Sequence, residues 1–511
     1  MHFILEKAGT KNSKNKIKMT FTPKEIGGLN HETELLIKQS REGACGVDLP
    51  ELEKFATRTG QKSREQIGLA QVNEPTVIRH FVRLSNQNYS IDAGFYPLGS
   101  CTMKHNPRLN EKMARLPGLA DIHPLQDQST VQGALELMFN LQNWLATLTG
   151  LDAVSLAPAA GAQGEFSGIL VIKKAHEKKG EAATRKIILI PDSAHGTNPA
   201  TASMCGFQIK VIPSDKEGLI DVAALEKLVA EHGESIAGTM ITNPNTCGKF
   251  EKNIKHIADL IHSVGGYFYC DGANYNAIVG KVRPADIGVD VMHFNLHKTF
   301  STPHGGGGPG SGPIAVSAEL AEFLPTPHVA KEGETYKLYA PKNTCGKVKG
   351  FNGQFGMHIR ALTYMLSHGA DGLQKVAEDS VLSANYILAK LKDHYHVPFE
   401  GHCMHECLLT DKIQKAQGIS TLDVAKALVE YGIHPMTIFF PIVVQGAMLI
   451  EPTETEGKET IDRFVDTMIY IAKEVEEGRG DRFHNYPLNT PRRRLDEVKA
   501  AKTPVTTWSQ I

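Results

Sequence analysis

The middle of the chain alternates short apolar segments with helix-like segments, and this alternation restricts the possible folds more than any other feature. The apolar runs lie at 185–190, 207–212, 236–241 and 266–270. Alternation of this kind predicts an α/β fold, in which helices cover both faces of a mostly parallel sheet. Because such sheets bind ligands at the carboxyl ends of their strands, the residues that follow each run are the first candidates for a functional site.

The length of the chain predicts more than one domain. With 511 residues the chain exceeds the usual size of a single domain. We expect an N-terminal arm at 1–90, a large domain at 91–350, a smaller C-terminal α+β domain at 351–480 and a tail at 481–511.

Within the smaller domain, helical periodicity predicts helices over 356–368 and 373–392. The segment 431–450 is largely uncharged, but Pro435 and Pro441 would break a membrane-spanning helix. We therefore interpret 431–450 as buried strands of the smaller domain.

Composition and charge exclude several classes of protein. Lys and Arg number 55 and Asp and Glu number 56, so the net charge of -1 gives no electrostatic basis for a nucleic-acid or membrane partner. The eight cysteines are too scattered to form a disulfide framework, and the N-terminus lacks the apolar core of a secretory signal. We expect a globular protein of the cytoplasm.

Two strand ends carry residues that indicate a cofactor. Asp271 ends the run that begins at Tyr267 and is followed by small residues, and Lys298 follows the apolar segment that begins at Met292. A lysine amine can form a Schiff base with pyridoxal phosphate, while a carboxylate pairs with the pyridinium nitrogen and keeps the ring an electron sink. Taken singly, Asp271 could be a turn residue and Lys298 a surface lysine. Their order and their small neighbours favour the cofactor.

Two further segments fit the same site. The glycine-containing stretch 156–166 precedes a helix, so its backbone N–H groups and the helix N-terminus could hold a phosphate. His195 follows the run that ends at Ile190, where an imidazole could stack on a pyridine ring. Alone, His195 could equally be a capping or loop histidine.

Three longer strings resemble one known family. They are Tyr-Pro-Leu-Gly-Ser-Cys-Thr-Met-Lys-His-Asn-Pro at 96–107, Ser-Ala-His-Gly-Thr-Asn-Pro at 193–199, and the lysine string at 297–310 with its four consecutive glycines. Together they resemble the P-protein of the glycine cleavage system, and in particular the second subunit of its two-subunit form. The similarity extends from about residue 20 to residue 499. His105, where tyrosine is expected, and a cluster of lysines at 11–18 depart from the family pattern.

The resemblance implies a fold-type I pyridoxal-phosphate enzyme. By this resemblance Lys298 is the Schiff-base lysine, Asp271 pairs with the ring nitrogen and His195 stacks on the ring. The same resemblance implies further contacts to the ring or phosphate from Ala162, Gln163, Thr242, Ala273 and His297.

The implied reaction is decarboxylation of glycine with transfer of the aminomethyl group to the lipoyl group of H-protein. The implied partner is a homologous first subunit, in an assembly with two copies of each chain; a homodimer of this chain stays open. Lys104 and Arg360 are candidates for binding the glycine carboxylate, and each could instead be structural.

Two alternative functions remain at this point, and a metal site is not predicted. Asp271 and Lys298 alone also fit another fold-type I decarboxylase or an aminotransferase. The chain could be a non-catalytic scaffold half, although Lys298 argues against this. The string at 401–407 has metal-binding residue types, but no second Cys/His pair at zinc spacing accompanies it, and its alternation predicts a strand and no metal site.

Overall fold

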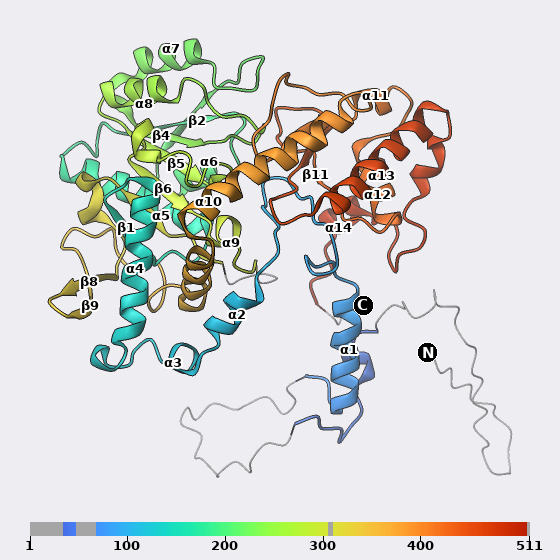
Figure 1. The fold of residues 1–511 in the computed structure, drawn as a ribbon, viewed down its shortest axis with the longest axis horizontal. Helices are drawn as coiled ribbons and strands as arrows, with labels where there is room; N and C mark the ends of the chain where they lie inside the picture. Colours follow the sequence, from blue (N-terminus) through green and yellow to red (C-terminus); the bar gives the residue numbers. More distant parts are fainter. Residues whose placement is uncertain (1–33, 48–67, 305–309, 508–511) are drawn as a thin grey trace. The chain divides into compact units, whose positions relative to one another are not determined.

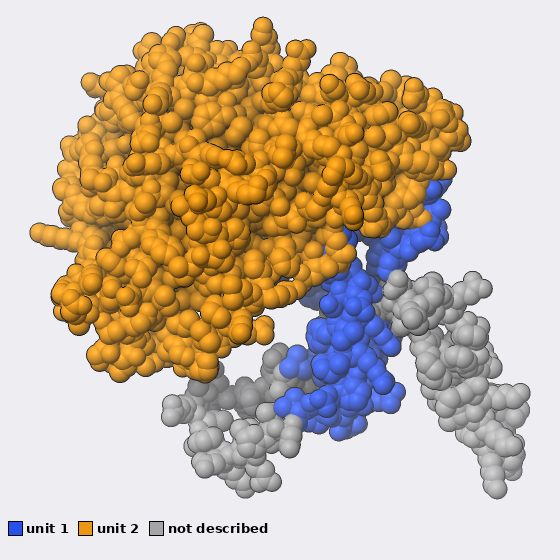
Figure 2. All heavy atoms as spheres, viewed as in Figure 1, with its two compact units in different colours: residues 1–90, 485–511 blue, residues 91–484 orange. Residues whose placement is uncertain are grey.

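The computed structural model describes residues 34–47, 68–304 and 310–507. The chain divides into two compact units, one formed by 1–90 with 485–511 and the other by 91–484 (Figure 2). The lysine cluster at 11–18 and the glycine run at 305–308 lie outside the described residues. The expected boundary between 350 and 351 stays a prediction.

The first unit contains short helices. They are η1 (Leu36–Gln39), α1 (Glu74–Asn86) and α14 (Glu497–Lys502). Helix α1 begins after Asn73, whose side chain accepts a hydrogen bond from the backbone N–H of Thr76 at 3.0 Å, and Pro75 stands in its first turn. Both features are typical helix-start signals.

The second unit is built around a seven-stranded sheet (Figure 1). Across the sheet the strands follow in the order β1 (Ala153–Ser155), β7 (Ile314–Val316), β6 (Val291–Phe294), β5 (Tyr267–Gly272), β4 (Ile236–Thr242), β2 (Ile187–Pro191) and β3 (Gln208–Ile212). Only β7 runs antiparallel to its neighbours. The mostly parallel α/β sheet is confirmed, and the four predicted apolar runs are β2, β3, β4 and β5.

Helices cover both faces of this sheet, as the continuous burial of its central strands requires. One apolar cluster contains Phe268 and Cys270 of β5 and packs against α4 (Gln132–Thr149), α7 (Val222–His232) and α8 (Ile254–Ser263). The other contains Tyr267 and Tyr269 and packs against α5 (Gly161–Lys178) and α6 (Thr197–Met204). Successive residues of β5 thus enter opposite cores, which explains its continuous apolar sequence.

The C-terminal part of this unit is a smaller α+β assembly. The long helix α10 (Phe355–Leu391) has one non-helical residue, Gly369 (φ 64°, ψ −174°), which separates the two predicted helices. It leads to a three-stranded sheet in the order β10 (Cys407–Thr410), β12 (Ala447–Ile450) and β11 (Thr437–Ile438), with α12 (Thr421–Glu430) and α13 (Lys458–Glu476). The remaining elements are α2 (Arg108–Ala114), α3 (Pro117–Ala120), η2 (Gln128–Thr130), η3 (Gly233–Ser235), η4 (Tyr275–Ala277), η5 (Pro284–Ile287), α9 (Leu296–Thr299), η6 (Ala318–Phe323), β8 (His328–Glu332), β9 (Thr335–Tyr339), α11 (Lys412–Lys415) and η7 (Gly480–Asn485).

Two expectations about strands are corrected. The string 401–407 is not a strand, because β10 begins only at Cys407. The segment 431–450 forms strands only at β11 and β12, and between them the side chains of Phe439 and Ile442 are 54% and 81% exposed. Pro441, which lacks an N–H donor, lies in the connection between the edge strand β11 and the central strand β12.

Among the described residues, no helix combines the length and the apolarity needed to cross a membrane. All eight cysteines belong to the described residues and are free thiols.

Candidate active site

A cavity of about 290 Å³ lies where β4, β5 and β6 end. Its lining consists of Ser100, Ala160, Gly161, Ala162, Glu165, His195, Thr197, Thr242, Thr246, Asp271, Ala273, Asn274, His293, Asn295, His297 and Lys298. All the site residues predicted from the sequence are in this set except Gln163. Strand pairing explains part of the convergence, because Thr242 is paired with Asp271, and Asp271 with His293, across three adjacent parallel strands.

Lys298 lies on α9, directly after β6, and is half-buried. Its Nζ atom donates a hydrogen bond to the backbone carbonyl oxygen of Ser100 at 2.7 Å. Ser100 is itself held by Glu406, whose Oε2 accepts a hydrogen bond from the Ser100 backbone N–H at 2.7 Å. The lysine amine is thus held at the cavity wall by a neutral acceptor.

Asp271 is the last acidic residue of β5, and its carboxylate is well supported. It accepts hydrogen bonds from the Asn198 side-chain amide at 3.0 Å and from the Ala273 backbone N–H at 2.9 Å. Burial raises the pKa of Asp271, but these two donors and the positive charge of Lys298 oppose that effect, and the pKa lies below its usual range. Asp271 is therefore a buried anion facing the cavity.

Two residues beside Asp271 were not predicted from the sequence. Glu165, the fifth residue of α5, and His293, on β6, are both buried and both line the cavity. Burial first, and then the charge of Asp271, raise the pKa of Glu165 to about 8. Burial lowers the pKa of His293, so its imidazole is neutral near pH 7. A histidine inside an apolar strand was the one available sequence signal.

His195 is exposed at the cavity and follows β2. Its Nδ1 atom accepts a hydrogen bond from the backbone N–H of Thr197 at 3.2 Å, and its ring lies 5.8 Å from that of Phe440. His195 thus lies at the carboxyl edge of the sheet, as predicted.

The N-terminus of α5 forms another wall of the cavity. Its N-cap residue, Ala160, has no side-chain atom that can accept a hydrogen bond. The first N–H groups of the helix therefore have no capping side chain. A Cβ at Gly161 would lie 2.4 Å from Oδ1 of Asn295, so a larger residue here would displace the Asn295 side chain. Helix N-termini of this kind bind phosphate groups.

Gln163 does not join the cavity lining. Its side-chain Oε1 accepts a hydrogen bond from the Ala159 backbone N–H at 2.7 Å, and its Nε2 donates to the Val348 carbonyl oxygen at 2.7 Å. The side chain therefore braces the loop before α5.

His297 lines the cavity beside His304. Burial, followed by the charges of neighbouring groups, lowers the pKa of His297 to about 3 and that of His304 to about 4. Both imidazoles are neutral at physiological pH, so their role is hydrogen bonding and packing.

Both candidates for the glycine carboxylate already have partners within the protein. Lys104 is buried, and its Nζ donates hydrogen bonds to Glu454 at 2.6 Å and to Asn276 at 2.9 Å. The guanidinium of Arg360 makes a two-point ion pair with Glu111 at 2.7 and 2.8 Å. These contacts favour the structural alternative for both residues.

The cavity suits pyridoxal phosphate by the chemistry of its donors. It combines a lysine amine, a buried carboxylate, an uncapped helix N-terminus and an exposed imidazole. In addition, the hydroxyl of Thr242 is buried and has no hydrogen-bond partner among the described residues. A buried polar atom of this kind requires a partner, which a bound polar ligand would supply.

Comparisons with known proteins identify the family of the chain. A family model described as glycine cleavage system P-protein matches residues 50–332, and one described as glycine dehydrogenase, C-terminal domain, matches 376–491. A relative from Caulobacter vibrioides, named probable glycine dehydrogenase (decarboxylating) subunit 2, is 53% identical and covers 95% of this chain and 93% of its own length. A relative of the same name from Listeria innocua is 50% identical and covers 93% of this chain and 98% of its own.

Solved structures show the same fold. A glycine decarboxylase (P-protein) of the glycine cleavage system in inhibitor-bound form aligns with a TM-score of 0.65 at 20% identity, covering 83% of this chain and 91% of that one. A glutamate decarboxylase from Lactobacillus brevis aligns with a TM-score of 0.60 at 13% identity, covering 84% and 96%. The expected fold-type I architecture is confirmed. Together with the family models and the close relatives, this shows that the chain belongs to the glycine cleavage system P-protein family, among the glycine dehydrogenase (decarboxylating) second subunits.

Proposed function

We propose that this chain is the pyridoxal-phosphate-binding subunit of a glycine dehydrogenase (decarboxylating). The observation that carries the proposal is the meeting of Lys298 and Asp271 in one cavity, at the ends of adjacent strands. When bound, the cofactor supplies an electron sink for the electron pair that decarboxylation leaves on the α-carbon. Family membership selects glycine among the substrates that such a site could serve.

The chain's own residues then have distinct tasks. Lys298 would hold the cofactor through its Nζ atom, and Asp271 would hold the proton on the ring nitrogen. His195 would stack on one ring face, and the N-terminus of α5, with Ala162, would bind the phosphate. Thr242, Ala273 and His297 would complete the wall of the cavity, which limits access of water.

In the net reaction the bond between the glycine α-carbon and its carboxylate breaks and CO2 leaves. The electron pair left on the α-carbon forms a bond to one sulfur of a lipoyl disulfide on H-protein. The S–S bond breaks, and the second sulfur leaves as a thiolate that takes up a proton. The disulfide is reduced and the glycine carbon is oxidised, so no further oxidant is needed.

The assembly and the compartment belong to the same proposal. The words "subunit 2" in the names of the relatives support a separate homologous first subunit, and we propose two copies of each chain. The eight free cysteines support a reducing compartment, the cytoplasm.

Exchange of the glycine carboxyl group with labelled bicarbonate tests this function. The full-length chain is assayed with and without a first subunit and lipoylated H-protein. We expect label in glycine with all three proteins, and none with Lys298→Ala. Lys337→Ala, at an exposed ion pair outside the cavity, is the matched control and should retain exchange. Absence of exchange by the complete wild-type system would contradict the proposal.

A further inference from the structure

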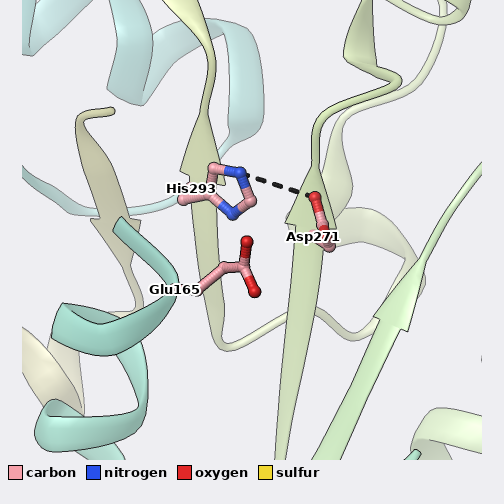
Figure 3. A group of neighbouring side chains, drawn as sticks. All are labelled: Glu165, Asp271 and His293. Carbon is pink, nitrogen blue, oxygen red and sulfur yellow. Dashed lines mark ion pairs between the residues drawn. The ribbon is translucent and has the colours of Figure 1, made fainter. Parts of the chain in front are cut away.

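Three buried side chains from three different elements meet at the wall of the cavity. Glu165 comes from α5, Asp271 from β5 and His293 from β6, and they point toward one another (Figure 3). One ligand-type atom of each lies within 4.8 Å of the others. Their residues are only 5%, 3% and 1% exposed. Groups this polar are not buried together without a specific arrangement of protons and hydrogen bonds.

One side-chain amide joins the two carboxyl groups. Nδ2 of Asn198 donates to Oε2 of Glu165 at 2.7 Å and to Oδ2 of Asp271 at 3.0 Å. Asp271 has a second donor in the Ala273 backbone N–H, whereas the only hydrogen bond to the Glu165 side chain within the described residues comes from Asn198. Two carboxyl groups this close together do not both ionise. The negative charge stays on the group that accepts more hydrogen bonds, because these bonds stabilise the charged form. Asp271 is therefore the anion and Glu165 the neutral acid.

The imidazole of His293 approaches Tyr269 through one ring nitrogen and Asp271 through the other. Its Nδ1 atom lies 2.6 Å from the hydroxyl of the buried Tyr269. Its Nε2 atom lies 3.4 Å from Oδ1 of Asp271, the ion pair that is dashed in Figure 3. Nε2 has no hydrogen-bond partner within the described residues. Since a carboxylate only accepts hydrogen bonds, the proton belongs on Nε2, and Tyr269 then donates to Nδ1. Hydrogen bonds of catalytic groups are often long before the ligand binds.

We propose that His293 and Glu165 are positioning residues for Asp271: His293 orients the carboxylate from the neighbouring strand, and Glu165 closes the opposite side as a neutral hydrogen-bonded acid. The site then presents one negative charge to the ring nitrogen of the cofactor. This inference rests on the proposed function, because it takes the cofactor to be pyridoxal phosphate bound beside Asp271. Outside these three residues, the charge of Lys298 also contributes to the pKa shifts of Glu165, Asp271 and His293.

The test measures binding of pyridoxal phosphate to the full-length apoprotein by equilibrium dialysis, with the absorption spectrum of the bound cofactor as a second readout. His293→Leu removes the donor at similar size and should weaken binding about 10-fold to 100-fold, the usual loss for a hydrogen bond to a charged group. His293→Gln restores a donor and should recover most of the affinity. Glu165→Leu should weaken binding, and Glu165→Gln should rescue it, because an amide has the shape of a neutral acid.

A double-mutant cycle separates positioning from a general structural role. If His293 acts through Asp271, the effect of His293→Leu should nearly vanish in an Asp271→Asn background. Tyr269→Phe removes a single oxygen, and it provides the same cycle if His293→Leu does not fold. Additive losses in this cycle, or a Glu165→Gln variant as defective as Asp271→Asn, would overturn the positioning roles while wild-type binding stays intact. Failure of the wild-type chain to bind the cofactor would overturn the proposed function as well.

Discussion

The Nζ atom of Lys298 donates a hydrogen bond to the backbone carbonyl oxygen of Ser100, 198 residues earlier in the chain, at 2.7 Å. The loop that supplies this oxygen has an unusual backbone, because Ser100 and Thr102 both have positive φ angles, 60° and 44°. Such angles are costly for residues other than glycine. Two buried carboxyl groups accept the N–H groups of this loop: Glu406 from Ser100 and Glu451 from Thr102. The position of the lysine thus depends on residues of the smaller α+β assembly.

We predict that Glu406→Ala destabilises the protein by about 1–3 kcal/mol, the usual cost of leaving a buried N–H unpaired. The same variant should release pyridoxal phosphate faster, since the loop that holds Lys298 relaxes. Burial raises the pKa of Glu406 well above its usual range, so Glu406→Gln is a close mimic and should restore both properties. Urea unfolding and dialysis measure the two effects. If Glu406→Ala had the stability and the cofactor release of the wild type, the loop would keep its conformation without the hydrogen bond to Glu406.

Lys104 should be a stability residue and not a substrate ligand. Its ammonium is buried against Glu454, and removing one partner of a buried pair typically costs about 3–5 kcal/mol. Lys104→Met should therefore lower the free energy of unfolding by about this amount and leave the KM for glycine nearly unchanged. A large rise in KM with normal stability would instead assign the glycine carboxylate to Lys104.

The central strands of the sheet could be predicted because they are buried and therefore apolar. Strands β2 to β5 are short apolar runs between helical segments, and those signals are local. The strand 401–407 was wrongly predicted because alternation alone does not show where hydrogen-bonded pairing begins. The exposed connection around Pro441 could not be predicted either, because the sequence alone does not show which residues pair with a neighbouring strand.

The same reasoning applies to the site. Asp271 and Lys298 could be predicted because charged residues directly after apolar strands are conspicuous. Glu165 and His293 could not, since their roles depend on the pairing of β5 with β6 and on the packing of α5. Lys104 meets Glu454 across 350 residues, and no local pattern encodes such a pair.

His195 should act through its ring face. We predict that His195→Ala weakens retention of pyridoxal phosphate after dialysis, because the ring loses its stacking partner. His195→Phe keeps an aromatic face and should retain more cofactor than the alanine variant. Equal retention by the wild type and His195→Ala would identify His195 as a loop residue that only accepts a hydrogen bond from Thr197.

Glu165 should make the stability of the apoprotein depend on pH. Its pKa rises from an ordinary 4.5 in the unfolded chain to about 8 in the folded one, so the folded state binds the extra proton. Its contribution is full below the unfolded pKa and is lost as pH rises through 8, so stability should fall between about pH 5 and pH 8. Asp271, with a lowered pKa, has the opposite sign and acts at lower pH.

The melting temperature of the apoprotein, measured across this range, tests the effect. Glu165→Gln cannot release a proton and should flatten the decline between about pH 5 and pH 8. The same slope in Glu165→Gln and the wild type would mean that Glu165 is ionised in the folded state.

The claim on which the whole account depends is that Lys298 carries the cofactor. Borohydride reduces the bond between a lysine amine and the aldehyde carbon of pyridoxal phosphate, and so makes the attachment permanent. Reduction of the loaded full-length chain, followed by proteolysis and peptide mapping, locates the attachment directly. The account predicts that the label is confined to the peptide containing Lys298, and that Lys298→Ala yields no labelled peptide. A label on another lysine, or none on the wild-type chain, would contradict it.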